Sequence, residues 1–263
     1  MSKTEAVHRV VPLPAMRQVY VDTLYLGHGK HTIHALLEVD VTVPRRTMAE
    51  HKARSGETLS FTAFVLGCLG QAIERRPYMH AVRTWRKRLV LFDEVDVTTM
   101  IEVQAGDERF PLAHVIRAVN KRPFADLHAE IRGHQAARER QPNPYERLIP
   151  LYNLAPGPLR RLVWRVLFRS PHLARRTFGT TILTSVGMFG RGAGWGIMMP
   201  LYTLGVTVGS IVDRPVLVDG QVEDREHLCL TLSFDHDIVD GAPAARFAQH
   251  LKELLESGYG LQA

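Results

Sequence analysis

The stretch from Leu228 to Leu255 constrains the fold more than any other part of this chain, because it changes from a strand pattern to a helix pattern within a few residues. Leu230, Leu232 and Phe234 alternate with other residues, as the apolar positions of a strand do. The apolar side chains that follow recur at helical spacing, and they are Ala244, Phe247, Leu251, Leu254 and Leu255. The sequence therefore predicts a strand, a turn and an amphipathic helix in direct succession.

The predicted turn carries His236, Asp240 and Gly241 in the pattern HxxxDG. A turn at the end of a rigid strand is well suited to presenting an imidazole to a substrate. Gly241 would permit a tight backbone, and Asp240 would cap the helix or hold a buried cation. Composition alone produces these three letters in roughly one chain in twenty, so a structural histidine is the alternative interpretation.

The length of 263 residues suits one large domain or two small ones, with a substantial core. Residues 1–16 lack the sustained apolar run of a signal peptide. The longest apolar stretch, near 61–73, is too short and too often interrupted by polar residues to span a bilayer. Cys68 and Cys229 are isolated, which favours core thiols over a disulfide and predicts a cytoplasmic protein.

The formal net charge of +6 comes from one segment. Residues 157–178 contain no acidic residue and six arginines, which are Arg160, Arg161, Arg165, Arg169, Arg175 and Arg176. Without them the chain has 27 basic residues, equal to its 27 acidic ones. A local basic patch on a balanced protein does not indicate nucleic-acid binding.

The predicted elements describe a single α+β domain over residues 1–263, without an internal repeat or a Ser/Gly-rich linker. Residues 59–77 have apolar side chains at helical spacing and end at Pro77. Further elements are a helix or extended arm at 10–26, helices at 45–54 and 124–140, and strands at 35–43, 88–92, 95–103, 111–119, 180–185 and 203–211. A basic helical segment at about 141–178 is inserted before the strand at 180–185.

Several blocks, in their order along the chain, resemble the catalytic domain of the acyltransferases of 2-oxo acid dehydrogenase complexes. They are PLPAMRQ with HTIHALLEVDVT, LSFTAFVLGCLGQAIERRPYMHA, HVIRAVNKRPFADLHAEIR, GTTILTSVGMFG and SFDHDIVDGAPAARF. Chloramphenicol acetyltransferase is a more distant relative. The resemblance implies a two-layer sandwich of a mixed sheet and helices, homotrimers with active sites between subunits, and acyl-coenzyme A as a substrate. No lipoyl or peripheral-subunit-binding segment precedes the matching region, so we expect a catalytic domain that stands alone.

The same resemblance assigns catalytic roles to two segments. His236 would be the general base that takes the proton of an attacking thiol or hydroxyl. Thr184, in TILTSVG, would supply the hydroxyl that stabilises the tetrahedral oxyanion, with Ser185 as the next candidate. The trimers that the family forms would bring His236 to face Thr184 across a subunit boundary. The alternative for Thr184 is an ordinary strand threonine whose hydroxyl bonds to nearby backbone.

Supporting roles follow from the resemblance as well. Asp240 would be structural, pairing with Arg17 of PAMRQ to hold the turn that bears His236. A solvated charge is the alternative for Arg17. Asp237 follows His236 where these enzymes usually carry arginine, which changes the local ion pairs and partner contacts. A carboxylate there could also raise the pKa of the imidazole.

The segment at 141–178 departs most from the family, whose connection at this place is usually short. Its apolar stripe consists of Leu159, Leu162, Val163, Val166 and Leu167, flanked by the arginines. A lid or docking helix packed on the core is the first interpretation. Binding of the phosphates of coenzyme A is the second, and attachment to an acidic membrane surface is the third.

Two weaker patterns carry no ligand prediction. The glycine-rich run at 190–196 lacks the βαβ context of a dinucleotide site and is expected to form a mobile loop near the active site. His28, His31 and His34 lack a supporting pattern of carboxylates or cysteines, so we predict no metal site.

We therefore expect a coenzyme A-dependent acyltransferase whose acceptor is a thiol, hydroxyl or amine, carried by a small molecule or by a separate lipoylated protein. Homotrimers are expected, and larger shells depend on whether the inserted segment permits them. The rival hypothesis is a catalytically silent assembly protein that keeps the fold. Retention of His236 and of a hydroxyl at position 184 argues against that rival.

Overall fold

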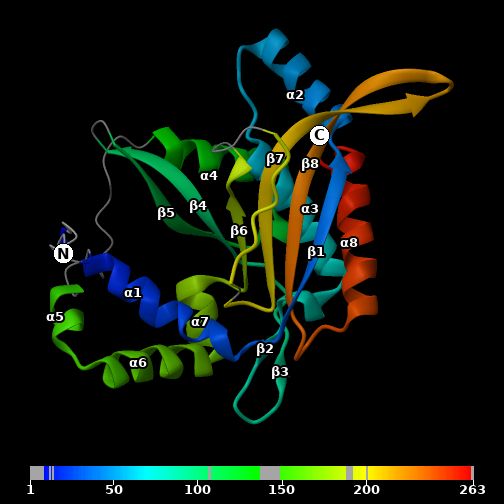
Figure 1. Ribbon diagram of the computed structural model, residues 1–263. Helices are drawn as coiled ribbons and strands as arrows, with labels where there is room; N and C mark the ends of the chain where they lie inside the picture. The colour runs from blue at the N-terminus through cyan, green and yellow to red at the C-terminus, as the bar shows by residue number, and fades with distance from the viewer. Residues whose placement is uncertain are drawn as a thin grey trace, which may run out of the picture.

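The computed structural model describes residues 9–261 except 12, 14, 106–107, 137–148, 188–191 and 200. A six-stranded mixed sheet runs through its centre in the order β1-β8-β7-β6-β4-β5 (Figure 1). The strands are Thr32–Asp40 (β1), Val97–Ala105 (β4), Glu108–Ile116 (β5), Thr181–Ser185 (β6), Leu204–Val218 (β7) and Gln221–Asp235 (β8). β6 runs parallel to β4 and β7, and the other pairs are antiparallel. A separate small hairpin pairs Val82–Arg83 (β2) with Leu89–Val90 (β3).

Eight helices surround this sheet in the described part of the chain. They are Ala15–Leu24 (α1), Thr42–Ser55 (α2), Phe61–Arg75 (α3), Phe124–Ala136 (α4), Ile149–Leu154 (α5), Gly157–Arg169 (α6), Pro171–Phe178 (α7) and Gly241–Glu256 (α8). Short 3-10 turns lie at Gly27–Gly29 (η1), Pro77–His80 (η2) and Val119–Lys121 (η3). α3 and α8 pack side by side on one face of the sheet, while α1, α5, α6 and α7 gather at one end (Figure 1). The predicted α+β sandwich is confirmed.

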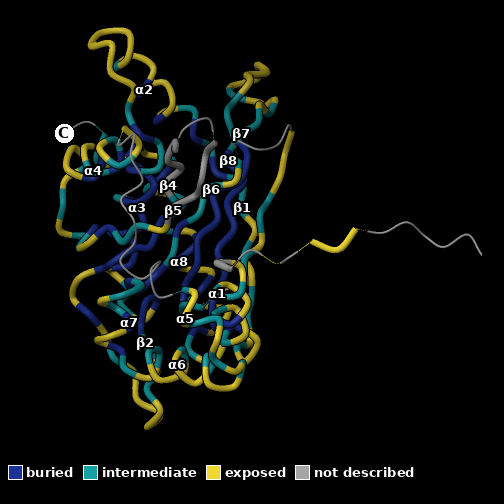
Figure 2. Tube along the Cα trace, turned by 90° about the vertical axis from the view of Figure 1, so that its left-hand side faces the viewer, coloured by how far each residue is buried: buried dark blue, intermediate teal, exposed yellow. Residues whose placement is uncertain are grey.

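The core lies between the sheet and the pair α3 and α8 (Figure 2). α3 is apolar around most of its circumference, and it begins where the Ser60 side chain accepts a hydrogen bond from the N–H of Ala63 at 3.2 Å. On α8, the ring of Phe247 meets the ring of Phe234 edge-on, with 6.0 Å between their centroids. Both helices predicted from apolar spacing are confirmed.

The two longest strands differ from their predictions. β7 continues to Val218 and β8 already begins at Gln221, because Asp219 and Gly220 adopt positive φ angles of 49° and 84° and close a two-residue turn. The resulting hairpin extends well beyond the sheet (Figure 1). A simple alternation is also wrong for β8, since every residue from Leu228 to Asp235 is buried.

Part of the second face of the sheet, over β1 and β7, is covered by the segment 192–199. Its Gly194 carbonyl accepts the N–H of Ser210 at 3.2 Å, and the indole N–H of Trp195 donates to the carbonyl of Leu37 at 3.0 Å. The described part of the glycine-rich run therefore lies on the sheet. This cover explains why β8 is buried on both faces.

The remaining predictions differ at their ends. The strand predicted at 35–43 begins earlier, at Thr32, and the strand predicted at 111–119 is β5, which ends at Ile116. The helix predicted at 124–140 is described as far as Ala136, and residues 137–148 lie outside the described residues. Cys68 and Cys229 are both free and buried, as predicted. None of the helices in the described ranges has the length and apolar character that a bilayer crossing requires.

Candidate active site

His236 lies on the turn between β8 and α8, directly after the buried Asp235. Its backbone N–H donates to the carbonyl of His31 at 2.6 Å, which fixes the turn to the residues before β1. The His236 side chain is 42% exposed, and its Nδ1 lies 3.8 Å from Oδ1 of Asp240. The backbone of His236 is thus held in place, while its imidazole ring is accessible to a ligand.

Two aspartates that flank His236 fasten the turn to its surroundings. The buried side chain of Asp235 pairs with Lys30, and its Oδ1 accepts the backbone N–H of Asp237 at 3.2 Å. Asp237 bonds through Oδ1 to Nδ1 of His31 at 2.8 Å, and its Oδ2 accepts from Arg83 at 3.0 Å. The turn is therefore tied both to the chain before β1 and to the β2–β3 hairpin.

The hydrogen bond with His31 holds the pKa of Asp237 below its usual range. The sequence identified Asp237 as a departure from the family, and the structure shows which ion pairs replace those of an arginine. Lys30, His31 and Arg83 were missed as site residues. A usable signal was the pairing of the first strand with the motif strand, because Thr32 opposite Asp235 brings His31 beside His236.

The predicted ion pair between Arg17 and Asp240 is wrong for the described part of this chain. Arg17 is exposed on α1, and the carboxylate of Asp240, with 83% exposure, has His236 as its ionic neighbour. The physical reason is that α1 anchors through a different residue, the buried Asp22, to the inserted segment. Lys30 with Asp235 takes over the fastening of the turn.

The helix start at Asp240 and Gly241 also differs from the prediction. Asp240 occupies the N-cap position of α8, but its side chain makes no capping hydrogen bond among the described residues. A Cβ built on Gly241 meets no described atom within 4 Å, and its φ is not in the left-handed region. This glycine is therefore not required for the tight backbone that we predicted.

Thr184 and Ser185 end β6 near the middle of the sheet, and both are half-buried. Leu183 faces the helical core, so the alternation of a strand turns the side chain of Thr184 to the opposite face. Thr184 pairs with Thr207 of β7, which pairs in turn with Thr231 of β8. The predicted oxyanion donor is therefore on the face that carries the segment 192–199.

Thr184 and His236 do not meet within one chain. His236 lies five residues beyond Thr231, the residue of β8 that is level with Thr184, and two strand positions separate β8 from β6. With about 3.3 Å per residue and about 4.8 Å per strand, their backbones are about 19 Å apart. A reaction that uses both side chains needs the His236 of one subunit and the Thr184 of another.

The inserted segment docks on α1 through polar contacts. The fully buried carboxylate of Asp22 accepts from Nε of Arg160 and from the hydroxyl of Tyr152, both at 2.7 Å. The hydroxyl of Tyr152 also accepts from the indole of Trp164 at 2.8 Å. Burial raises the pKa of Asp22, but the hydrogen bonds from Arg160 and Tyr152 outweigh it and hold the pKa below its usual range.

The apolar stripe of α6 does not pack against the rest of the described structure. Leu159, Leu162, Val163 and Val166 are exposed by 52%, 51%, 47% and 55%. Of the three interpretations of this segment, the docking helix is met in part, because α5 and α6 pack on α1 rather than on the core. The anchoring side chains are Arg160 and Tyr152 rather than the stripe. Asp22 was missed, because a single acid in a short helix gives no sequence signal for burial.

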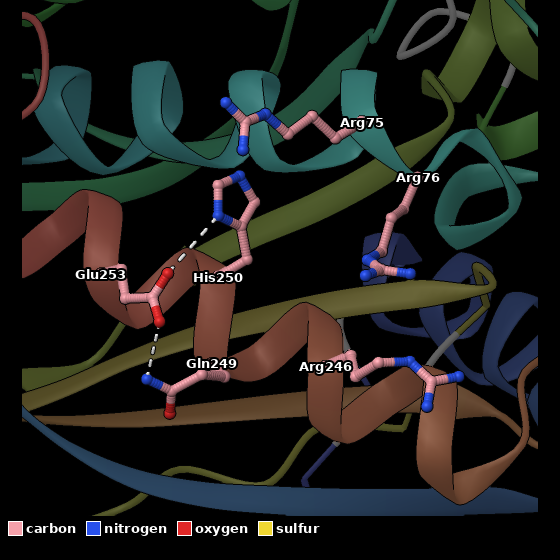
Figure 3. Close-up of a pocket in the computed structure, with 6 residues that line it drawn as sticks. All are labelled: Arg75, Arg76, Arg246, Gln249, His250 and Glu253. Atoms are coloured by element: carbon pink, nitrogen blue, oxygen red, sulfur yellow. Dashed lines mark hydrogen bonds and ion pairs between the residues drawn. The ribbon is translucent and has the colours of Figure 1, made fainter.

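Two grooves are lined by clusters of cationic side chains. One of about 380 Å³ lies between η1, α6 and the chain before β7, and it is lined by Leu26, Lys30, Leu162, Arg165, Phe168, Arg169 and Leu201. Lys30 connects this groove to the turn of His236 through Asp235. The other, of about 590 Å³, lies between α3 and α8 and is lined by Arg75, Arg76, Arg246, Gln249, His250 and Glu253 (Figure 3). None of the predicted catalytic residues lines either groove.

The sandwich of a mixed sheet and helices has the chloramphenicol acetyltransferase-like fold. The solved structure of a chloramphenicol acetyltransferase superposes on 92% of this chain and 98% of its own, with a TM-score of 0.50 and 15% identity. The cubic core of the pyruvate dehydrogenase multienzyme complex matches 99% of this chain and 96% of its own, with a TM-score of 0.71 and 20% identity.

The sequence comparisons are more specific than the shared fold. Residues 169–261 match the model of the acyltransferase catalytic domain of 2-oxoacid dehydrogenases. The lipoamide acyltransferase component of the branched-chain alpha-keto acid dehydrogenase complex of Bacillus subtilis (strain 168) is 26% identical over 227 residues, which are 84% of this chain and 46% of the relative. The predicted resemblance is confirmed: residues 169–261 match the model of this acyltransferase domain, and the whole chain shares the fold of a solved catalytic core. The chain spans less than half the length of that Bacillus relative.

Proposed function

We propose that this chain transfers an acyl group between coenzyme A and an acceptor thiol, hydroxyl or amine, with His236 as the general base. The observation that carries the proposal is the presentation of His236, whose backbone is pinned to His31 while its ring remains accessible. The match of residues 169–261 to the model of an acyltransferase catalytic domain supports the reaction class. The neighbouring aspartates are engaged with Lys30, His31 and Arg83, which leaves the imidazole as the base of this turn.

The proposed reaction moves one proton and exchanges one bond at the acyl carbon. His236 takes the proton from the attacking thiol, and the sulfur attacks the thioester carbonyl. The hydroxyl of Thr184 from a neighbouring subunit donates to the oxyanion of the tetrahedral intermediate. Collapse breaks the old carbon–sulfur bond, and the departing thiolate takes the proton back from His236. A thiol has a reference pKa of about 8.5 and an imidazole of about 6.5, so the first proton transfer is only modestly uphill.

The assembly and partners are proposed on the same basis. A homotrimer would supply the second subunit that the separation of Thr184 and His236 demands. Lys30, Arg165 and Arg169 line one groove and are suited to the phosphates of coenzyme A. A separate lipoylated protein and small hydroxylated or amino compounds are the candidate acceptors. A cytoplasmic location agrees with two buried free thiols.

The test measures consumption of acetyl-coenzyme A with dihydrolipoamide, a small alcohol and a small amine as acceptors. We expect His236→Ala to lower kcat by about 10²–10⁴-fold with the preferred acceptor. Thr184→Val should lower it by about 10²–10³-fold. His250→Ala, in the groove between α3 and α8, is the matched control and should leave kcat unchanged.

If no acceptor distinguishes the wild type from His236→Ala, the chain is a silent assembly protein and the proposal fails. A preference for the alcohol over dihydrolipoamide would identify a detoxifying type of enzyme instead of a partner of a dehydrogenase complex.

A further inference from the structure

A second group of chemically active side chains lies at the opposite edge of the sheet from β1. His114 is on the edge strand β5, while Glu130 and His134 are four residues apart on α4, which places them on one face of the helix. One ligand atom from each lies within 4.8 Å of the other two, and all three residues are half-buried. The rings of His114 and His134 approach to 3.8 Å between centroids.

We propose that His114, Glu130 and His134 bind a divalent transition-metal ion, with Zn²⁺ as the preferred cation. Two imidazoles and one carboxylate form a ligand set that Zn²⁺ favours when a fourth position is left to water. Around a tetrahedral Zn²⁺ the ligand atoms are roughly 3.4 Å apart, because the metal–ligand bonds are about 2.0–2.2 Å. The three ligand atoms lie within 4.8 Å of one another, so the widest separation has to close by about 1.4 Å or less to reach that arrangement.

The present contacts agree with a site that exchanges a proton for a metal ion. Nε2 of His114 and Oε1 of Glu130 are 2.8 Å apart, and a metal ion would take the place of the shared hydrogen. The second oxygen, Oε2, accepts from Arg122 at 2.5 Å, so Glu130 is oriented from outside the cluster as metal-bound carboxylates are. His134 makes no hydrogen bond to another residue within the described ranges, and it packs against the ring of His114.

The location assigns the ion a structural role. β5 is the last strand of the sheet and pairs only with β4 among the described strands. An ion shared by β5 and α4 would clamp the helix onto this open edge and so protect it. The site is independent of the turn of His236, since four strand positions separate β5 from β8.

The experiment titrates Zn²⁺ into the full chain after removal of metals with a chelator, by calorimetry, and repeats the titration with Co²⁺ by visible absorption. We expect one ion per chain and the intense visible bands of four-coordinate Co²⁺. His134→Gln should weaken Zn²⁺ binding by at least about 100-fold, more than the loss of an outer-shell partner does. Zn²⁺ should raise the melting temperature of the wild type but not that of His134→Gln.

The matched control is His250→Gln, since His250 also lies on a helix near a glutamate, Glu253 at 3.8 Å, but has no third ligand in the described part of the chain. It should bind Zn²⁺ as the wild type does. If His134→Gln does not fold, Glu130→Gln replaces it. The proposal is overturned if the wild type binds no stoichiometric Zn²⁺, or if binding survives His134→Gln and is lost in His31→Gln.

Discussion

Asp237 fixes the turn that carries the proposed base, His236. Its carboxylate joins His31 and Arg83, which come from segments far apart in the sequence, and its own backbone adjoins His236. Exposed ion pairs of this kind contribute little to global stability, about 0–1 kcal/mol. Their effect on the placement of the neighbouring imidazole is expected to be larger, because small displacements of a reacting group are costly to the rate.

We expect Asp237→Ala to lower kcat by roughly 10- to 100-fold, with little change in the melting temperature. Steady-state kinetics with acetyl-coenzyme A and thermal melts provide the two measurements. Glu223→Ala is the control, because Glu223 pairs with Arg225 at 3.0 Å on the protruding hairpin and is remote from the turn. An equal loss of activity in both variants would contradict the positioning role.

The low pKa of the buried His80 determines part of the pH dependence of the free energy of unfolding. Burial lowers the pKa of His80 to about 4, and its Nε2–H donates to the carbonyl of Phe92 at 3.1 Å. Between pH 6.5 and pH 4 the unfolded chain binds a proton at this position that the folded chain does not, so stability falls as the pH drops through this window. The shift corresponds to on the order of 3 kcal/mol.

Urea unfolding of the wild type at pH 7, 5.5 and 4.5 should show this loss, and His80→Gln should show a clearly smaller one. Asp22, Asp40 and Asp96 have lowered pKa values because hydrogen bonds to arginines and other donors outweigh their burial. Their contributions are lost only below about pH 4, beneath the window of His80. An unchanged slope in His80→Gln would assign the acid sensitivity to other groups.

The residues of the site were predictable to different degrees. His236 was predicted as a candidate because a histidine directly after a strand pattern is visible in the sequence. The residues that hold its turn in place could not be predicted in this way, because they come from segments that are distant in the sequence. Lys30 and His31 become neighbours of the turn only through the register of β1 with β8. The Arg17 prediction failed because family position alone does not decide which acid an arginine meets.

On the scale of secondary-structure elements, the inserted segment is attached by its polar residues. Asp22 of α1 holds Arg160 and Tyr152, which belong to α6 and α5. Asp22→Asn removes the charge but keeps the size, so it should free α5 and α6 without disturbing the sheet. We expect trypsin to cleave at the arginines of α6 roughly tenfold faster or more. Asp213→Asn, on the exposed part of β7, is the control; equal cleavage rates in the two variants would contradict the docking role.

Helices were easier to predict than strands in this chain. α3 and α8 have apolar positions at helical spacing together with clear end signals, and their predicted limits agree with the structure within a few residues. β7 and β8 were predicted too short, because the charged residues of their hairpin resemble a loop when pairing is not visible. Their length follows from the Asp219–Gly220 turn, which locks the register.

On the scale of the whole molecule, the proposed reaction needs two copies of the chain. Mixing His236→Ala with Thr184→Val, each strongly impaired alone, should restore activity, because an interface between an intact His236 and an intact Thr184 forms again. In a one-to-one mixture with random exchange of subunits, half of the subunits have an intact His236 and half have an intact Thr184. About a quarter of the sites then have both, so we expect about a quarter of the wild-type rate. The rate is measured after unfolding and refolding the mixture together. A mixture as inactive as its components would show that the two residues serve one subunit or different reactions.

The separation of Thr184 from His236 has a further consequence for how this protein must be handled. A reaction centre divided between polypeptides exists only while they remain associated, so specific activity should decline on dilution below the dissociation constant of the assembly and return on reconcentration. The rate measured at nanomolar protein would then depend on the fraction of assembled subunits rather than on the catalytic step. A lag in the loss of activity after dilution would measure the dissociation rate of the subunits.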